Sequence, residues 1–272
     1  MKQVKPSMSV LVAFPKHKVN VFCERLLQDL PEVYVCPFPV LELIEIDFDV
    51  KVEVLEMTDC VIFSSAFGAE VFMKKLADKL SSDEIHQLFV KTQIATVGPS
   101  IRALLEQYKL KVTWSGAENT IASLQRTLLG EGSFKEGKRV VFVTGKKTLC
   151  DDLMKTLIQQ GCDCKHWVVY DSQMLEKVDW QSFDDFYKID SENKYICLSS
   201  PEGVKALANL MLKGKRELPL GVNLLSLGPS TYKAASEVFP NYNHITRQTN
   251  HSYSGLIESL ESLSTSFKNN HS

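Results

Sequence analysis

Short apolar runs alternate with longer segments that repeat apolar residues at helical spacing along most of the chain. The run CVIF at 60–63 precedes AFGAEVFMKKL, and the run ICL at 196–198 is followed after two serines by PEGVKALANLM. Apolar runs of this length predict buried strands, and apolar residues three and four positions apart predict amphipathic helices. Because strands that alternate with helices form parallel sheets with right-handed crossovers, the pattern predicts an α/β protein of the doubly wound class.

The same series of segments is written twice. Residues 96–105 read TVGPSIRALL and residues 226–235 read SLGPSTYKAA, and each is preceded by a strand that ends in Ser-Ser. Residues 9–40 and 139–172 match as strand, basic loop, helix and strand. The chain therefore reads as two copies joined near 130–137. The G-x-x-x-x-G-K match at 132–138 lies in this joint and predicts no phosphate loop, because Arg139 replaces Ser or Thr and a strand follows.

Composition and charge exclude several classes of protein. At 272 residues the chain is long enough for two ordinary domains, and a net charge of −2 gives no general attraction to nucleic acid. No apolar stretch is long enough to span a membrane. Seven cysteines without a secretory signal indicate a reducing compartment, so we expect a cytoplasmic protein. Cys162 and Cys164 lack the further ligands of a zinc site, and Cys60 and Cys197 read as core residues.

The polar residues that follow the predicted strands meet at the carboxyl ends of the sheets, where doubly wound proteins bind ligands. A Gly-Pro-Ser turn starts a helix with a close backbone turn, a proline at the first helical position and a hydroxyl near the free amides. Helix starts of this kind attract anions, by roughly 0.3–1 kcal/mol at exposed sites. The residues concerned are Ser64, Ser65, Gly98, Ser100, Ser199, Ser200, Gly228 and Ser230. The alternative is that these residues only cap their helices.

The ordered set VIFSSAFGAEVF, IATVGPSIRALL, RVVFVTGKKTLCDDL, WVVYDS, ICLSSPEGVKAL, LLSLGPSTYKAA and SYSGLIESL resembles the uroporphyrinogen-III synthase family over residues 9–263. The resemblance implies two flavodoxin-like domains with doubly wound parallel sheets, joined by a two-stranded linker, one domain being inserted into the other. Residues 1–38 and 173–267 would form the first domain, residues 41–170 the second, and residues 268–272 a loose tail. The segments CPFPV and VVYDS would form the linker.

The family's reaction is implied in the same way. Its members cyclise hydroxymethylbilane, a linear tetrapyrrole with eight carboxylates, to uroporphyrinogen III, with loss of water and inversion of ring D. We therefore expect a lyase of haem biosynthesis that needs no metal and no cofactor. We also expect a monomer that binds neither nucleic acid nor membrane, and a transient hand-off of substrate from hydroxymethylbilane synthase is a further expectation.

The resemblance also implies roles for individual residues in a cleft between the domains. Tyr170 would lie nearest the leaving hydroxyl and donate a proton or hydrogen bond. Lys146 and Lys147 lie in a loop that is often basic in the family, and Lys16 and Lys18 hold the equivalent loop of the other copy. Contacts to substrate carboxylates are implied for Ser64, Ser65, Ser200, Ser230 and Thr231.

The chain departs from the family pattern at two places. Ile101 stands where a threonine is common, although Thr231 is kept in the other copy, and Leu149 and Cys150 stand where an arginine is often found. Two other classes stay open. One is a domain of the same fold that binds a tetrapyrrole without turning it over. The other is a flavodoxin-type FMN protein, which the loop AFPKHK disfavours because it has no Ser or Thr to bind phosphate.

Overall fold

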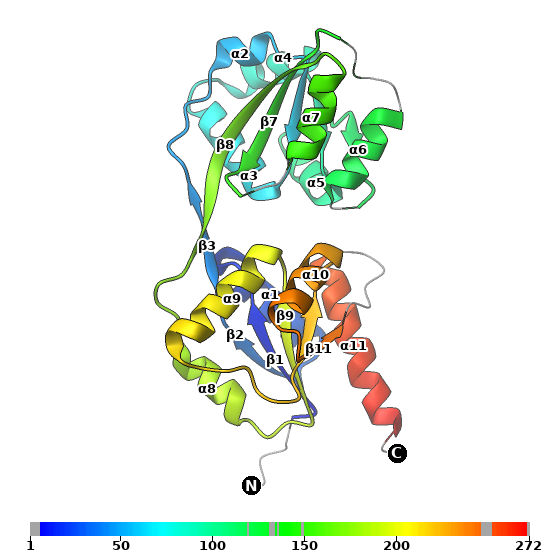
Figure 1. The fold of residues 1–272 in the computed structure, drawn as a ribbon. Helices are drawn as coiled ribbons and strands as arrows, with labels where there is room; N and C mark the ends of the chain where they lie inside the picture. Colours follow the sequence, from blue (N-terminus) through cyan, green and yellow to red (C-terminus); the bar gives the residue numbers. More distant parts are fainter. Residues whose placement is uncertain are drawn as a thin grey trace. The chain divides into compact units, whose positions relative to one another are not determined.

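The computed structural model of the chain describes residues 6–118, 120–130, 134, 136–147, 150–245 and 252–270. The chain divides into two compact units: Met1–Leu43 together with Gln173–Ser272 form unit 1, and Ile44–Ser172 form unit 2. The chain passes from one unit to the other twice, along β3 (Leu41–Glu45) and along β8 (Asp163–Met174) (Figure 1). These two strands are neighbours in one sheet.

Unit 1 is built on a five-stranded sheet in the order β11-β10-β9-β1-β2. All of its strand pairs are parallel. Its strands are β1 (Met8–Ala13), β2 (Tyr34–Pro37), β9 (Asn193–Leu198), β10 (Asn223–Ser226) and β11 (Asn243–Ile245). Its helices are α1 (Lys16–Asp29), α8 (Trp180–Lys188), α9 (Pro201–Gly214), α10 (Pro229–Val238) and α11 (Tyr253–Asn270).

The central strands of unit 1 are apolar on both faces because helices cover both faces. Leu11 and Ile196 point into a core with α8, α9 and α10, whereas Val10 and Tyr195 point into a second core with α1 and α11. Figure 1 shows α8 and α9 on one side of this sheet. Two covered faces leave only the ends of the strands free to carry polar residues.

Unit 2 contains the six-stranded sheet, in the order β3-β8-β7-β4-β5-β6. The pairs from β8 to β6 are all parallel. Its further strands are β4 (Cys60–Phe63), β5 (Gln93–Thr96), β6 (Trp114–Ser115) and β7 (Arg139–Gly145). Its helices are α2 (Val52–Glu56), α3 (Ala66–Ala77), α4 (Ser82–Lys91), α5 (Pro99–Gln107), α6 (Ile121–Gly130) and α7 (Asp151–Gln159).

Each unit combines parts of both sequence copies. In unit 1, β1 and β2 come from the first copy and β9, β10 and β11 from the second. In unit 2, β4, β5 and β6 come from the first copy, and β7 and β8 from the second. The sheet of unit 1 consequently has the flavodoxin-type order 2-1-3-4-5. In the other sheet, the five strands β8-β7-β4-β5-β6 have the same order, but its first two positions are taken by β8 and β7, which come last along the chain.

The doubly wound α/β class predicted from the sequence is confirmed. The last helix, α11, runs to Asn270 and so extends into the segment 268–272. The helices α2, α4 and α8 were not anticipated. None of the helices in the described part of the chain is both long and apolar enough to cross a membrane.

Candidate functional site

The carboxyl-end edge of the unit 2 sheet gathers the polar residues that the sequence singles out in this unit. Ser64 and Ser65 follow β4, Gly98 follows β5, and Lys146 and Lys147 follow β7. Tyr170 lies beside this edge on β8, where it pairs in register with Gly145, the last residue of β7. Because β4, β5, β7 and β8 run parallel, their polar followers are brought to one edge of the sheet.

Ser64 and Ser65 use their hydroxyl groups in different ways. Ser65 is the N-cap of α3, with an extended backbone, and its Oγ accepts a hydrogen bond from the Gly68 amide at 3.1 Å. The Ser65 proton is thus left to donate to a ligand. Ser64 instead donates its own proton to the Val143 carbonyl at 3.3 Å. Of the two, Ser65 has the arrangement suited to an anion.

The ring of Tyr170 is packed between two glycines and is only 9% exposed. A Cβ added to Gly145 would lie 2.4 Å from the Tyr170 Cζ, and one added to Gly68 would lie 3.3 Å from the Tyr170 Cε1. Phe67 adds an edge contact, with ring centroids 5.2 Å apart and planes at 84°. These contacts hold the phenol ring in a fixed position at the edge of the sheet, next to the first turn of α3.

Lys146 and Lys147 share a carboxylate that the sequence did not single out. The Asp171 Oδ2 lies 3.6 Å from the Lys146 Nζ, and the Asp171 Oδ1 lies 3.9 Å from the Lys147 Nζ. Lys147 also donates to the Ser172 carbonyl. The two lysines are exposed, whereas the Asp171 side chain is 16% exposed. Sequence reasoning missed Asp171, although it lies inside the motif VVYDS, because its role depends on the pairing of β7 with β8.

The start of α5 is the Gly-Pro-Ser turn of unit 2. Gly98 is the N-cap and Pro99 the first helical residue, and no side chain of the described residues caps this turn. The Gly98 carbonyl accepts the amides of Ile101 and Arg102 at 3.2 and 3.3 Å. Ser100 is exposed at the edge, whereas Ile101 is buried and points into the unit. A threonine at position 101 would therefore place its hydroxyl in the core of the unit and not at the edge.

Unit 1 repeats the serine cap at its own carboxyl-end edge. Ser200 is the N-cap of α9, and its Oγ accepts the Gly203 amide at 3.0 Å. Ser199 is partly buried, and its Oγ has no hydrogen-bond partner among the described residues. Ser200 therefore matches Ser65, whereas Ser199 lacks the hydrogen bond that Ser64 makes with the Val143 carbonyl.

The second Gly-Pro-Ser turn starts α10. Gly228 is the N-cap with an extended backbone, and again no described side chain caps the turn. Ser230 is exposed at the edge, whereas Thr231 is 2% exposed and belongs to the buried side of α10. Thr231 thus occupies the same kind of interior position as Ile101 in the other copy.

The basic loop of unit 1 follows β1. Lys16 is the first residue of α1 and pairs with Glu42 at 2.9 Å, both side chains being exposed. Lys18 is partly buried. Glu42 is a second carboxylate that sequence reasoning missed, since it lies 26 residues away in β3. In the other copy, Leu149 lies outside the described residues, and Cys150 is fully buried at the start of α7.

The cysteines expected in the core are there. Cys60 and Cys197 are fully buried, and burial raises the pKa of both thiols well above the ordinary value. Thiols in that state are poor nucleophiles and poor metal ligands at neutral pH. Neither belongs to the edge that carries the serines.

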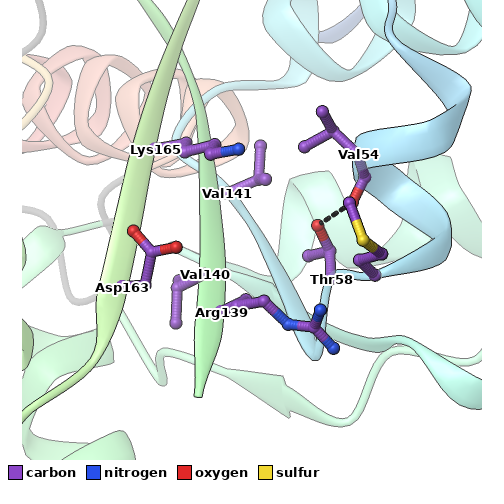
Figure 2. A pocket seen from close by; sticks show the side chains of 8 residues that line it. Val54, Thr58, Arg139, Val140, Val141, Asp163 and Lys165 are labelled. Carbon is purple, nitrogen blue, oxygen red and sulfur yellow. Dashed lines mark hydrogen bonds between the residues drawn. The ribbon is translucent and has the colours of Figure 1, made fainter. Parts of the chain in front are cut away.

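A small pocket lies at the opposite, amino-terminal end of the unit 2 sheet (Figure 2). Its volume of about 20 Å³ holds about one water molecule. Arg139 and Asp163, the first residues of β7 and β8, line it together with Val54 of α2. Thr58 also lines it and donates to the Val54 carbonyl at 2.7 Å. The pocket is separate from the candidate site, because β7 ends at Gly145 on the other edge.

Comparisons with known proteins agree with this architecture. A family model described as uroporphyrinogen-III synthase HemD matches residues 32–243. A structure of a variant uroporphyrinogen III synthase from Thermus thermophilus has a TM-score of 0.58 at 16% identity, covering 95% of this chain and 99% of the other. The uroporphyrinogen-III synthetase of Helicobacter pylori has a TM-score of 0.58 at 13% identity, covering 94% and 99%. These structures share the fold. No curated protein sequence is similar enough to count as a match.

Proposed function

The chain belongs to the uroporphyrinogen-III synthase HemD family, and we propose that it closes hydroxymethylbilane to uroporphyrinogen III. In this reaction the terminal hydroxyl leaves as water, ring D is inverted through a spiro intermediate, and the macrocycle is closed. The proposal includes a mechanism without metal or cofactor. It makes the chain a lyase of tetrapyrrole biosynthesis.

The observation that carries the proposal is the duplicated carboxyl-end edge. Each edge has one serine-capped helix, at Ser65 or Ser200, and one Gly-Pro-Ser helix start, at Gly98 or Gly228. Amides and hydroxyls at helix starts bind carboxylates without many arginines. A substrate with eight carboxylates needs several such groups, and we propose that both edges receive its carboxylates.

Individual contacts follow from the hydrogen bonds of the serines. Ser65 and Ser200 accept an amide and keep their protons for a carboxylate. Hydrogen bonds to charged groups are worth about 1.5–3 kcal/mol each and less when exposed, so each serine contributes modestly. Ser100 and Ser230 lie at the other two helix starts and add further hydroxyls. In this proposal a carboxylate also competes with Asp171 for Lys146 and Lys147.

Tyr170 is the group that we propose to assist the loss of the hydroxyl. When the C–O bond breaks, the oxygen keeps the electron pair and needs a proton to leave as water. The electrons of the pyrrole stabilise the carbon that is left behind. A phenol held beside the leaving oxygen donates that proton or a hydrogen bond, and positioned acids of this kind contribute about 10² to 10⁴ in rate.

Isomer analysis of the product tests the proposed reaction. Hydroxymethylbilane closes by itself without ring inversion, so the oxidised products separate into type I from the uncatalysed route and type III from the enzyme. We expect the protein to give type III faster than the uncatalysed closure. Type I alone, at the uncatalysed pace, would contradict the proposal. Tight tetrapyrrole binding in the same sample would then identify a non-catalytic binding domain.

Chelation tests the metal-free part of the mechanism. We expect EDTA to leave the rate of type III formation unchanged, because amides, hydroxyls and a phenol supply the proposed chemistry. The measurement compares the rate before and after EDTA, and again after excess Mg²⁺ or Zn²⁺. Loss of activity with EDTA and its return with one of these ions would overturn this part.

A further inference from the structure

The position of the Tyr170 ring depends on the absence of a side chain at Gly145. A Cβ built on Gly145 would lie 2.4 Å from the Tyr170 Cζ, 2.6 Å from Cε2 and 2.8 Å from the hydroxyl oxygen. These distances are far inside van der Waals contact, and they involve the end of the ring that carries the hydroxyl. The opposite edge of the ring faces Gly68, whose added Cβ would lie 3.3 Å from Cε1 and 3.7 Å from Cδ1.

The second copy of this motif lacks the arrangement. Pro15 follows β1 and pairs in register with Leu41, as Gly145 pairs with Tyr170. The serine cap is kept, since Ser200 caps the Gly203 amide as Ser65 caps the Gly68 amide. The two copies thus share the strand pairing and the cap. They differ at both members of one pair, glycine with tyrosine in unit 2 and proline with leucine in unit 1.

We propose that Gly145 is a positioning residue for Tyr170. Because Gly145 has no side chain, the phenol ring packs directly against the backbone at the end of β7. The inference rests on the proposed role of Tyr170 in the loss of the hydroxyl. Its physical basis is that a ring already in contact with Gly68 and Phe67 cannot withdraw from Gly145 without turning its hydroxyl away. Gly145 has no left-handed backbone, so alanine there changes the contact with the ring without straining φ.

The test is Gly145→Ala, alone and combined with Tyr170→Ala. Misplacing a reacting group by about 1 Å costs up to about 10²-fold, so we expect Gly145→Ala to lower kcat by about ten- to a hundredfold and to change KM little. In the Tyr170→Ala background the same change should have almost no further effect, because the ring is gone. A full additional loss in that background would overturn the proposal.

Gly130→Ala is the matched control. An added Cβ at Gly130 meets nothing within 4 Å, and Gly130 ends α6 without a left-handed backbone. This variant should keep wild-type kcat. If Gly145→Ala proves unstable, the thermal melts of the same set decide: in the Tyr170→Ala background, Gly145→Ala should cause almost no further loss of stability. Equal losses in both backgrounds would contradict the contact.

A spectroscopic readout separates this inference from the proposed function. In protein labelled with ¹³C-tyrosine, the Tyr170 ring signals are identified by their absence from Tyr170→Phe. Gly145→Ala should shift these signals more than those of any other tyrosine, whether or not the protein makes type III product. Unshifted signals overturn the positioning. If the signals shift but kcat is unchanged in an active enzyme, the positioning of the Tyr170 ring by Gly145 has no role in catalysis.

Discussion

At the scale of single residues, Ser64 and Ser65 are neighbours that should respond differently to the same substitution. Ser65 keeps its proton for a ligand, whereas Ser64 donates inward to the Val143 carbonyl. We expect Ser65→Ala to raise KM several-fold, with a smaller fall in kcat, because one hydrogen bond to a carboxylate is lost among many. Ser64→Ala should raise KM less. Steady-state kinetics with hydroxymethylbilane measures both.

The loss of a helix cap must be separated from the loss of a substrate contact. Ser81 caps α4 as Ser65 caps α3, in a capping box with Glu84, and it lies away from the carboxyl-end edge. Removing either cap should cost about 0.5–2 kcal/mol of stability. Only Ser65→Ala should change KM. Equal KM values for Ser65→Ala and Ser81→Ala would assign Ser65 to capping alone.

The sequence predicted residues whose roles are local and missed those whose roles depend on strand pairing. Ser65 and Ser200 precede apolar helical patterns, so their place at helix starts could be predicted from neighbouring residues alone. The contacts of Asp171 with the lysines and of Gly145 with Tyr170 depend on the register of β7 against β8. A slip of one residue would turn every side chain of β8 to the other face of the sheet, so these contacts depend on the pairing of residues that are distant in the sequence.

At the scale of elements, the C-terminus of α9 carries strain that can be measured. Lys215 ends the helix in the left-handed region, with φ 50° and ψ 47°. A residue with a Cβ is destabilised by about 1–2 kcal/mol in this region. Glycine adopts the region with little strain, but it loses more conformational entropy on folding. We expect Lys215→Gly to raise the free energy of unfolding by about 0.5–1 kcal/mol, as measured by urea denaturation.

Lys213 provides the matched comparison. It is exposed like Lys215 but lies in the last turn of α9, where the backbone is still helical and glycine weakens the helix. Lys213→Gly should therefore lower the free energy of unfolding by about 0.5–1 kcal/mol. Both variants should keep the activity of the unchanged protein, since the start of α9 at Ser200 is the end proposed to bind substrate. The same sign for both substitutions would contradict the left-handed cap.

Elements were predictable where the sequence marks them by both periodicity and caps. The long helices α3 and α9 follow serine caps and have apolar residues at helical spacing, and both were predicted. The sequence also marks the starts of α4 and α8 with capping residues: Ser81 forms a capping box with Glu84, and Asp179 accepts the amides of Gln181 and Ser182.

At the scale of the whole molecule, the two sequence copies exchange their first strand-helix-strand segments. The sheet of unit 1 needs β9 beside β1, and the sheet of unit 2 needs β7 beside β4. Residues 41–170 contain every strand from β4 to β7 and residues 163–170 of β8. We therefore expect this fragment to fold by itself, with a cooperative urea transition measured by circular dichroism.

A fragment of residues 1–130 is the natural counterpart. It contains one complete sequence copy but separates β1 from β9 and β4 from β7. It should show no cooperative transition, because the central strands of both sheets lack a neighbour. Cooperative folding of 1–130, together with failure of 41–170 to fold, would mean that the sequence copies are themselves the folding units.

The most direct test of the whole account is the single-turnover rate of Tyr170→Phe, measured with the isomer composition of its product. Phenylalanine keeps the ring against Gly145 and Gly68 but removes the proton that the phenol donates. The account predicts type III product, with the chemical step slowed roughly ten- to a thousandfold in a correctly folded protein, water and the pyrrole electrons supplying the residual rate. An unchanged chemical step in that variant would contradict it and leave Tyr170 with a packing role alone.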